Sequence, residues 1–328
     1  MKAVWYDRLG PAREVLRQGE QPTPEAAPGE VRVRLHASGV NPADVKRRVG
    51  SFGMEYPFVV PHSDGAGIVD QVGAGADPAL LGRRVWLFNG QRNGRNMGTA
   101  AEYIALDAWL VAPLPDDVSF AEGACLGIPC MTAHYNVFAD GPVDGRTVLV
   151  TGGAGAVGHY AVQWAKWGGA RVIATVSSPE KAAHATAGGA DHTIDYRRED
   201  VGARVMELTG GKGADRIVEV DIEANFKSSL AALAPGGTIA TYATTPGAEP
   251  GFSFLPAAVK GALLRFMILY AVPQAAIDAA RTDIARWLAE SPRRHTVAAT
   301  FPLAETAAAH EHVETAGKLG TVVVLPAD

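Results

Sequence analysis

Three glycines with the spacing Gly-x-Gly-x-x-Gly, at Gly153, Gly155 and Gly158, most clearly predict chemistry in this chain. They follow the apolar run 147–150, typical of a buried parallel strand, and precede an apolar helix ending at 168–169. The first glycine permits a sharp turn, the second lets backbone approach a pyrophosphate, and the third lets the helix pack on its strand. The helix start offers free amides and a positive dipole end. We predict a dinucleotide site here; a tight turn without a ligand is the alternative.

Two other nucleotide-binding patterns do not fit this stretch. A P-loop requires Lys followed by Ser or Thr after the glycines, and these are missing. The short-chain dehydrogenase pattern has a different glycine spacing and a downstream Tyr-x-x-x-Lys, which this chain also lacks.

Size and composition narrow the class of protein. The 328 residues exceed the usual size of one core, so we expect two domains. A net charge of −5 and a pI near 6.0 argue against nucleic-acid binding. No apolar run has membrane-spanning length, and the N-terminus lacks a signal-peptide pattern. Two cysteines, Cys125 and Cys130, fit a reducing cytoplasm and the role of small core residues.

The first 120 residues predict a β-rich, barrel-like domain. Short strands are expected between glycine and proline turns, at 2–6, 30–38, 68–72, 84–88 and 101–105. In 30–38, apolar and polar residues alternate, which indicates a half-buried strand. A short helical turn is expected over 41–50.

The following segment alternates strands and helices, which predicts a doubly wound parallel sheet and an α/β fold class. After an apolar helical stretch at 120–138, strands are expected at 147–150, 171–176, 216–220 and 237–242. The dense apolar stretch 266–272 is interpreted as a further strand, and 275–290 as an amphipathic helix. The final strand, 321–325, is expected to return to the first domain.

The whole pattern resembles the medium-chain dehydrogenase/reductase superfamily, and within it the zinc-free, zeta-crystallin-like NADPH:quinone oxidoreductases. The resemblance covers nearly the full length. Besides the glycine turn, the matching stretches are Ala37-Ser-Gly-Val-Asn-Pro-Ala-Asp, Asp64-Gly-Ala-Gly-Ile-Val, Gly98-Thr-Ala-Ala-Glu-Tyr, Leu126-Gly-Ile-Pro, Gly189-Ala-Asp-His, Ala234-Pro-Gly-Gly and 310–318.

The resemblance implies two domains with the active site in the cleft between them. A GroES-like substrate and catalytic domain is expected over 1–120, completed by 275–328, and a Rossmann domain over 121–274. The zinc-ligand positions of metal-dependent relatives correspond to Asn41, Ser63 and Ile128, which do not form a zinc-ligand set, so no metal is expected. His62 stands where relatives usually have glycine, and a solvent-facing or hydrogen-bonded histidine is the expectation.

Coenzyme choice is predicted from the end of the second Rossmann strand. Ser177 and Ser178 leave no carboxylate there for a ribose hydroxyl, and Lys181 one turn later is placed to pair with a 2′-phosphate. A solvated helix lysine is the alternative. NADPH is therefore predicted. With the positions implied by the resemblance, the predicted coenzyme-binding residues are Asn41, Thr132, Gly153, Ala154, Gly155, Ala156, Val157, Ser177, Lys181, Tyr196, Tyr242, Thr244, Phe266, Ile268 and Lys318.

Hydride transfer without zinc requires hydrogen-bond donors to polarise the substrate oxygen. The resemblance places Asn41 and Thr132 at the nicotinamide, with Asp44 and Lys46 close to Asn41. Lys46 is a candidate donor to a developing oxyanion, and a surface lysine is the alternative. A predicted wall for a flat acceptor comprises Phe52, Trp86 and Asn89, although core packing is equally expected for the tryptophan.

The predicted activity is reduction of a quinone by NADPH. The alternatives are reduction of conjugated enones or enals, and a low-activity NADPH-binding structural or RNA-binding relative. The acidic balance disfavours RNA binding. The expected substrate is the small-molecule acceptor. A homodimer is expected through the apolar strand near residue 266, and a central strand in a monomer is the alternative. No membrane partner is expected, and the predicted location is cytoplasmic.

Overall fold

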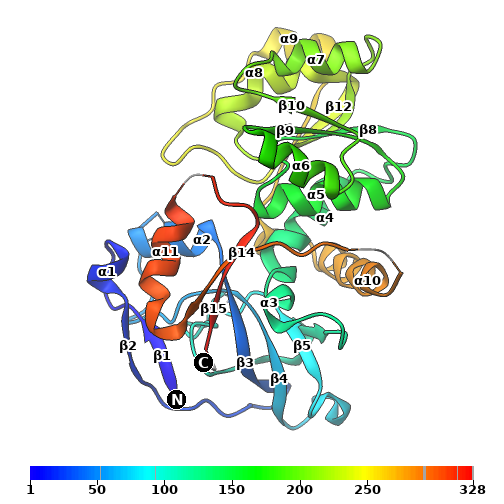
Figure 1. Cartoon of the computed structure of the whole chain (residues 1–328). Coiled ribbons are helices and arrows are strands. Elements are labelled where there is room, and N and C mark those ends of the chain that lie inside the picture. The colour runs from blue at the N-terminus through cyan, green and yellow to red at the C-terminus, as the bar shows by residue number, and fades with distance from the viewer. Residues whose placement is uncertain (52, 93, 291–292, 316, 327–328) are drawn as a thin grey trace. The chain divides into compact units, whose positions relative to one another are not determined.

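A computed structural model describes residues 1–51, 53–92, 94–290, 293–315 and 317–326. The chain divides into two compact units, which are described separately (Figure 1). Unit 1 contains 1–129, 284–291 and 295–328, and unit 2 contains 130–283 and 292–294. Both units have a β-sheet with helices, so the predicted α/β class is confirmed.

Unit 1 is built around a seven-stranded sheet. Its strands are β3 (Glu30–Val40), β4 (Asp64–Val72), β5 (Arg84–Leu87), β6 (Tyr103–Asp107), β7 (Val111–Pro113), β14 (Val297–Pro302) and β15 (Thr321–Leu325). The order is β14-β15-β3-β4-β5-β7, and β6 pairs with β3. A second, two-stranded sheet joins β1 (Lys2–Trp5) to β2 (Arg17–Glu20). The helices are α1 (Ala12–Val15), α2 (Pro42–Val49), α3 (Phe120–Gly123) and α11 (Thr306–Glu314).

The long strand β3 organises this sheet. It alternates buried residues such as Val31, Val33 and Leu35 with more exposed neighbours, as the sequence pattern predicts. The C-terminal strand β15 pairs antiparallel with it, with Val323 opposite Gly39. The red end of the chain therefore lies beside the blue β3 in Figure 1, and the predicted return of the last strand is confirmed.

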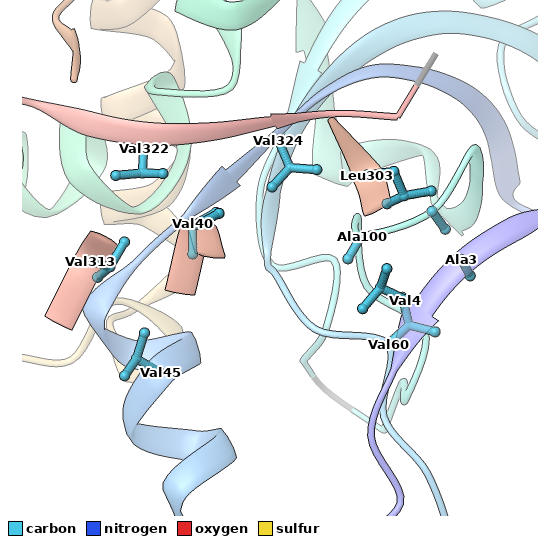
Figure 2. Packing of buried hydrophobic residues seen from close by; sticks show 12 residues of the cluster. Ala3, Val4, Val40, Val45, Val60, Ala100, Leu303, Val313, Val322 and Val324 are labelled. Carbon is cyan, nitrogen blue, oxygen red and sulfur yellow. The ribbon is translucent and has the colours of Figure 1, made fainter. Parts of the chain in front are cut away.

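A valine-rich cluster joins the helices of unit 1 to this sheet. Figure 2 shows Val40 of β3, Val45 of α2, Val313 of α11, and Val322 and Val324 of β15 in one core. Each is at most 8% exposed. Burying a valine contributes roughly 2 kcal/mol. The cluster therefore fixes α2 and α11 against the strands.

Unit 2 is a doubly wound parallel sheet. Its strands are β8 (Thr147–Val150), β9 (Arg171–Val176), β10 (His192–Asp195), β11 (Ala214–Glu219), β12 (Leu233–Thr241) and β13 (Leu263–Phe266). They run in the order β10-β9-β8-β11-β12-β13, and all their pairings are parallel. The strand order reverses direction between β8 and β11. In such sheets, ligands bind at the carboxyl ends of the strands at this switch point.

One helix precedes the strands of unit 2, and the others connect them. They are α4 (Met131–Phe138), α5 (Ala156–Trp167), α6 (Pro179–Ala187), α7 (Val201–Leu208), α8 (Ile222–Ala232) and α9 (Phe254–Lys260). Helix α10 (Gln274–Glu290) begins in unit 2 and ends in unit 1, which resumes at Ile284. Its residues Ile277, Ala280, Ile284, Trp287 and Leu288 are buried, as its amphipathic pattern predicts.

One predicted strand is wrong. The apolar pattern predicts a strand over 266–272, but β13 ends at Phe266 and a 3₁₀ turn covers Leu269–Ala271. Hydrophobicity alone does not distinguish a strand from a turn with a buried side chain. Here Leu269 is buried at 4% exposure while Phe266 is 60% exposed, so the apolar stretch does not form one continuous buried element.

Candidate functional site

The glycine turn connects β8 to α5 at the switch point. Gly152 has φ 64°, its amide donates to Thr175 Oγ1 at 2.9 Å, and the Gly153 amide donates to the Thr175 carbonyl at 3.0 Å. Gly155 is the N-cap of α5, so the first amides of that helix point out of the turn without intrahelical partners. The turn therefore presents the positive end of a twelve-residue helix at the carboxyl edge of the sheet.

The glycines of the turn differ in what a side chain would meet. A Cβ at Gly158 would lie 2.2 Å from the Gly152 carbonyl oxygen, and one at Gly153 would lie 2.7 Å from Ala174 Cβ. At Gly155 the nearest atom would be 3.4 Å away, an ordinary contact. Gly153 and Gly158 are thus required by the protein's own packing, whereas Gly155 leaves an open face. This is the arrangement that suits the approach of a diphosphate.

The residues predicted to bind the 2′-phosphate of the coenzyme lie together at the tip of β9. Lys181 Nζ donates to Ser177 Oγ at 3.0 Å, and Ser178 caps α6 by accepting from the Lys181 amide at 3.3 Å. Ser177 is buried, and Tyr196, just after β10, is 50% exposed. No aspartate or glutamate ends β9, so the tip carries one positive charge beside a hydroxyl. That chemistry fits a phosphate better than an unsubstituted ribose.

The remaining predicted coenzyme positions of unit 2 lie on several elements. Thr132 is buried in α4, and Tyr242 follows β12 with its amide donating to the Glu219 carbonyl at 3.3 Å. Within the part of the chain that the structure describes, Thr244 Oγ1 is buried without a hydrogen-bond partner. Phe266 ends β13 and Ile268 follows it, both substantially exposed. The end of β12 thus holds an unsatisfied hydroxyl on the same sheet edge as the turn.

Glu219, which was not predicted from the sequence, holds the start of the glycine turn through a hydrogen bond. Its carboxylate accepts hydrogen bonds from Thr151 Oγ1 at 3.0 Å, Asn225 Nδ2 at 2.8 Å and Ser229 Oγ at 2.6 Å. Burial raises the pKa of this carboxyl above its ordinary value, although the hydrogen bonds oppose the shift. Because Thr151 immediately precedes the glycines, Glu219 fixes the start of the turn. An acidic residue ending a strand next to the glycine strand was the available signal.

In unit 1, Asn41 and Asp64 meet in a buried polar cluster. Asn41 Nδ2 donates to Asp64 Oδ2 at 2.7 Å, and the Ile128 amide donates to the same oxygen at 2.8 Å. The backbone amide of Asn41 donates to Asp44 Oδ2 at 2.8 Å at the start of α2. A Cβ at Gly127 would lie 2.1 Å from Asp64 Oδ1, so glycine is required there. The cluster thereby holds the asparagine side chain in one orientation.

Both carboxyl groups of this cluster have altered acidity. Burial raises the pKa of Asp64 to about 8, with the Asn41 hydrogen bond opposing the shift. Burial also raises the pKa of Asp44, and Arg92, 4.0 Å from its Oδ1, lowers it in part. With its pKa raised to about 8, the Asp64 carboxyl is mostly protonated at neutral pH. Sequence reasoning noted Asp64 only as a family position, and its burial was the missing information.

Several buried polar atoms of unit 1 lack a hydrogen bond within the described residues, and four of them belong to the region around Asn41. They are Oδ1 of Asp44, Oγ of Ser63, Oδ1 of Asp64 and Oδ1 of Asn89. Such atoms are rare in folded proteins and call for a water or a ligand. Asn89 has φ 55°, which places its short side chain in a left-handed backbone position that asparagine tolerates. These four oxygen atoms lie on or beside residues predicted to act in catalysis and substrate binding.

The other predicted residues of unit 1 are less closely joined. Lys46 lies in α2 and is partly exposed. Trp86 is 1% exposed and packs against Phe88 at a ring distance of 5.9 Å, so it belongs to the core, and its role in a substrate pocket stays a prediction. Lys318 follows α11 and donates to the Val313 carbonyl at 2.7 Å. Phe52 lies outside the described residues.

His62 is buried and hydrogen-bonded. It has φ 74°, is 0% exposed, and contacts His310 through two Nε2 atoms 2.9 Å apart. The prediction of a hydrogen-bonded histidine is therefore confirmed, and that of a solvent-facing histidine is wrong. Among the described residues, no group of three or more His, Cys, Asp or Glu side chains is arranged to hold a metal ion. No helix in the described ranges combines the length and the hydropathy needed to span a membrane.

Comparison with known proteins agrees with this architecture. Residues 27–116 match the alcohol dehydrogenase GroES-like domain family, and residues 156–285 match the zinc-binding dehydrogenase family. A quinone oxidoreductase from Pseudomonas aeruginosa is 32% identical over 95% of this chain and 96% of its own. A 2-haloacrylate reductase from a Burkholderia species is 31% identical over 99% of both chains.

A solved mycobacterial structure, determined in complex with NADPH, has a TM-score of 0.88 and 32% identity, covering 99% of this chain and all of the other. A GroES-like domain match, a doubly wound sheet and a glycine turn at its switch point together define a medium-chain dehydrogenase/reductase. Within that superfamily, the chain belongs to the quinone oxidoreductase family.

Proposed function

We propose that this protein is an NADPH-dependent quinone oxidoreductase. The observation that carries the proposal is the pairing of an open glycine turn with a Lys181–Ser177 pair at the tip of the next strand. The turn suits the diphosphate, and the lysine suits a 2′-phosphate, so the phosphorylated coenzyme is favoured over NADH. The NADPH complex of the similar mycobacterial protein supports this choice.

The residues of the chain bind and orient the reactants. When bound, the nicotinamide supplies the hydride. We propose that Thr132, Tyr242 and Thr244 line its end of the coenzyme site, the last with a buried hydroxyl that lacks a partner within the described chain. Glu219 holds the start of the glycine turn through Thr151. The coenzyme would thus be held by groups that are already ordered.

We propose that Asn41 is the hydrogen-bond donor to the acceptor or the carboxamide, and that Asp64 fixes its orientation. Asp64 Oδ2 accepts one amide proton from Asn41, which leaves the second proton and the amide oxygen for a ligand. Lys46, on the helix that starts at Asn41, remains our candidate for stabilising negative charge on a reduced quinone oxygen. Reduction of a quinone to a hydroquinone takes one hydride, which gives the hydroquinone monoanion, and one proton from solvent or a nearby acid.

A second candidate activity is reduction of a conjugated carbonyl. The similarity to 2-haloacrylate reductase over nearly the full length favours it. Hydride addition to an enone also produces negative charge on an oxygen that needs a donor. Asn41 and Lys46 would donate to this oxygen as well, so the geometry of the site fits both kinds of acceptor. Kinetic measurements distinguish them.

The test compares acceptors at saturating NADPH. We expect kcat/KM for 1,4-naphthoquinone to exceed that for but-3-en-2-one and 2-chloroacrylate by at least about 100-fold, equivalent to about 2.7 kcal/mol of transition-state stabilisation. The opposite ranking would assign the enzyme to conjugated carbonyl reduction. Binding of NADPH without turnover of any of these acceptors would contradict both activities.

We propose further that the protein acts as a homodimer through α9 and β13. The exposed apolar residues of unit 2 concentrate there, with Phe254 82%, Val259 79%, Leu255 69%, Phe266 60% and Leu263 56% exposed. The strand β13 lies at the edge of the sheet order in the described part of the chain. An apolar edge strand with an adjacent apolar helix favours pairing with an identical surface.

We propose a cytoplasmic location. Both cysteines of the chain, Cys125 and Cys130, are buried and free of disulfide bonds. This cysteine usage fits a reducing compartment. The proposed partners are a small-molecule acceptor and a second copy of the chain, and the net charge of −5 disfavours nucleic acid.

A further inference from the structure

A chain of buried hydrogen bonds crosses unit 1 through His62. His310 Nε2 and His62 Nε2 lie 2.9 Å apart, and His62 Nδ1 lies 2.8 Å from Ser38 Oγ. Ser38 Oγ is 2.7 Å from Thr99 Oγ1, which donates to the Asp64 carbonyl at 2.6 Å. All of these residues are fully buried. The chain therefore reaches the backbone of the residue that orients Asn41.

The other end of this chain lies on α2. Arg48 Nε donates to His310 Nδ1 at 3.3 Å, and its two terminal nitrogens donate to the Gly10 carbonyl and to Glu314. Arg48 is 0% exposed and lies in the last turn of the helix that Asn41 begins. The sequence alone hides this arrangement, since Arg48 and His310 are 262 positions apart.

The chemistry of the donor groups fixes the position of every proton in this chain of hydrogen bonds. Arginine only donates, so His310 Nδ1 accepts and its proton is on Nε2. His62 Nε2 must then accept, which places the His62 proton on Nδ1, directed to Ser38. The Ser38 hydroxyl donates to Thr99, which donates to Asp64. The order from Arg48 to Asp64 runs in one direction and satisfies both neutral imidazoles.

Burial keeps both imidazoles neutral. It lowers the pKa of His62 to about 3, and it lowers the pKa of His310 well below its ordinary value, with His62 and Arg48 contributing. A proton relay is excluded because Arg48, the donor at the head of the chain, does not give up its proton. What remains for the chain to do is to hold the elements that it joins.

Those elements are the ones that carry the proposed catalytic residues. Asn41, at the start of α2, is bound to the Asp64 side chain, while Arg48, at the end of α2, is bound through His310 to His62. The helix is thus tied at both ends to the segment 62–64. Figure 2 shows that Val45 of α2 and Val313 of α11 share the same core, so the hydrogen bonds at the two ends of α2 add directional contacts to this apolar packing.

The backbone at His62 is unfavourable for its residue type. Its φ of 74° lies in the left-handed region that glycine adopts without cost. A histidine held there needs compensating contacts, and its contacts are His310, at a ring distance of 5.1 Å, and Ser38. The imidazole is therefore retained against the local backbone preference.

We propose that His62 is a positioning residue for the oxidoreductase reaction: with His310 it locks the C-terminal end of α2 and so fixes Asn41, Asp44 and Lys46 for catalysis. The proposal rests on the proposed function for its kinetic consequence. Its structural consequence, the rigidity of α2, is independent of that function.

The test uses two variants of His62 and one control. His62→Gly suits the backbone and removes the imidazole, whereas His62→Gln can accept from His310 with its oxygen and donate to Ser38 with its nitrogen. Val69→Ala, at a fully buried position of β4, is the control for general loosening of unit 1. Each full-length protein is examined by hydrogen exchange with mass spectrometry and by quinone kinetics.

We expect His62→Gly to speed exchange of the α2 amides about 10-fold or more. It should lower kcat with 1,4-naphthoquinone about 10-fold while leaving the dissociation constant of NADPH within about 2-fold, because a misplaced donor slows catalysis more than coenzyme binding at the glycine turn. His62→Gln should restore both values, and Val69→Ala should leave kcat unchanged.

The proposal is overturned if α2 exchange and kcat in His62→Gly match the wild type, or if Val69→Ala reproduces the same losses. It is also overturned if His62→Gln fails to restore α2 protection. A wild type without quinone turnover would refute the proposed function instead, and the exchange data would still decide whether His62 locks α2.

Discussion

At the scale of single residues, Asp64 is the group whose chemistry the fold changes most. Its carboxyl is buried, holds Asn41, and has a pKa raised from 3.8 to about 8. A folded pKa above the unfolded value means that the native state binds the extra proton between these two values. The stability that this proton contributes is fully present below pH 3.8 and is lost as the pH rises to about 8.

Asp64→Asn keeps an oxygen that accepts from Asn41 and removes the titration. We expect the free energy of unfolding of the wild type, relative to this variant, to fall by on the order of 1 kcal/mol per pH unit between pH 5 and 8. Urea unfolding followed at several pH values measures the difference, and subtraction cancels groups that both proteins share, such as Glu219. Parallel pH profiles for the two proteins would show that Asp64 is ionised throughout.

Lys181 is the residue on which coenzyme choice depends. Its ammonium group is placed by a hydrogen bond to Ser177 at the tip of β9. We expect Lys181→Ala to raise KM for NADPH about 10-fold, the loss of one charge-assisted hydrogen bond, and to leave KM for NADH nearly unchanged. Lys181→Arg, which keeps the charge, is the control. An NADPH-to-NADH preference that survives in Lys181→Ala would remove the lysine from the site.

At the scale of elements, different glycines of the β8–turn–α5 unit serve the packing of the fold and the binding of the coenzyme. A Cβ at position 158 would collide with the Gly152 carbonyl, whereas one at position 155 would make only an ordinary contact. We expect Gly158→Ala to lower the thermal midpoint by several degrees, because the backbone must move. Gly155→Ala should keep the midpoint within about 1 °C and weaken NADPH binding about 10-fold or more, since its methyl group faces the diphosphate.

Calorimetry of the two glycine variants, with and without NADPH, makes this comparison. Wild-type affinity in Gly155→Ala would mean that the open face of the turn does not receive the diphosphate. An unchanged midpoint in Gly158→Ala would mean that the turn adjusts more easily than its geometry indicates.

The elements of unit 2 could largely be predicted because their signals are local. The β8–turn–α5 unit and β9 depend on neighbouring residues, and the structure has them within a residue or so of the expected bounds. The segment after Phe266 could not, because whether Leu269 turns inward depends on what surrounds it. The helix α9 was missed, since its residues are exposed and show no inward-facing stripe.

The site could be predicted only in part, for the same physical reason. Gly153, Gly155, Ser177 and Lys181 follow from spacing along two successive βα units, and the structure brings the last two together. The contact between His62 and His310 spans 248 positions, so nothing near His62 announces it. Burial of Asp64 and Glu219, and hence their raised pKa values, likewise depends on the packed structure. The domain limits 1–120 and 121–274 stay a prediction.

At the scale of the whole molecule, the apolar surface of α9 and β13 predicts the oligomeric state. We expect the wild type to sediment at twice the chain mass of 34.3 kDa. The double variant Phe254→Glu/Val259→Glu should sediment at the chain mass, because each new carboxylate would be desolvated in the interface. Leu81→Glu, at an exposed apolar position of unit 1, should remain dimeric. A wild type that sediments at 34.3 kDa would refute the dimer.

The most direct measurement for the whole account is a single-turnover experiment. The protein, dialysed against a chelator, is loaded with one equivalent of NADPH without oxygen and mixed with 1,4-naphthoquinone. We predict that the bound NADPH is oxidised with one equivalent of quinone consumed, and that dideuteration at the nicotinamide C4 slows the reaction at least about 2-fold. Bound NADPH that is oxidised no faster than free NADPH, or a requirement for added metal, would contradict it.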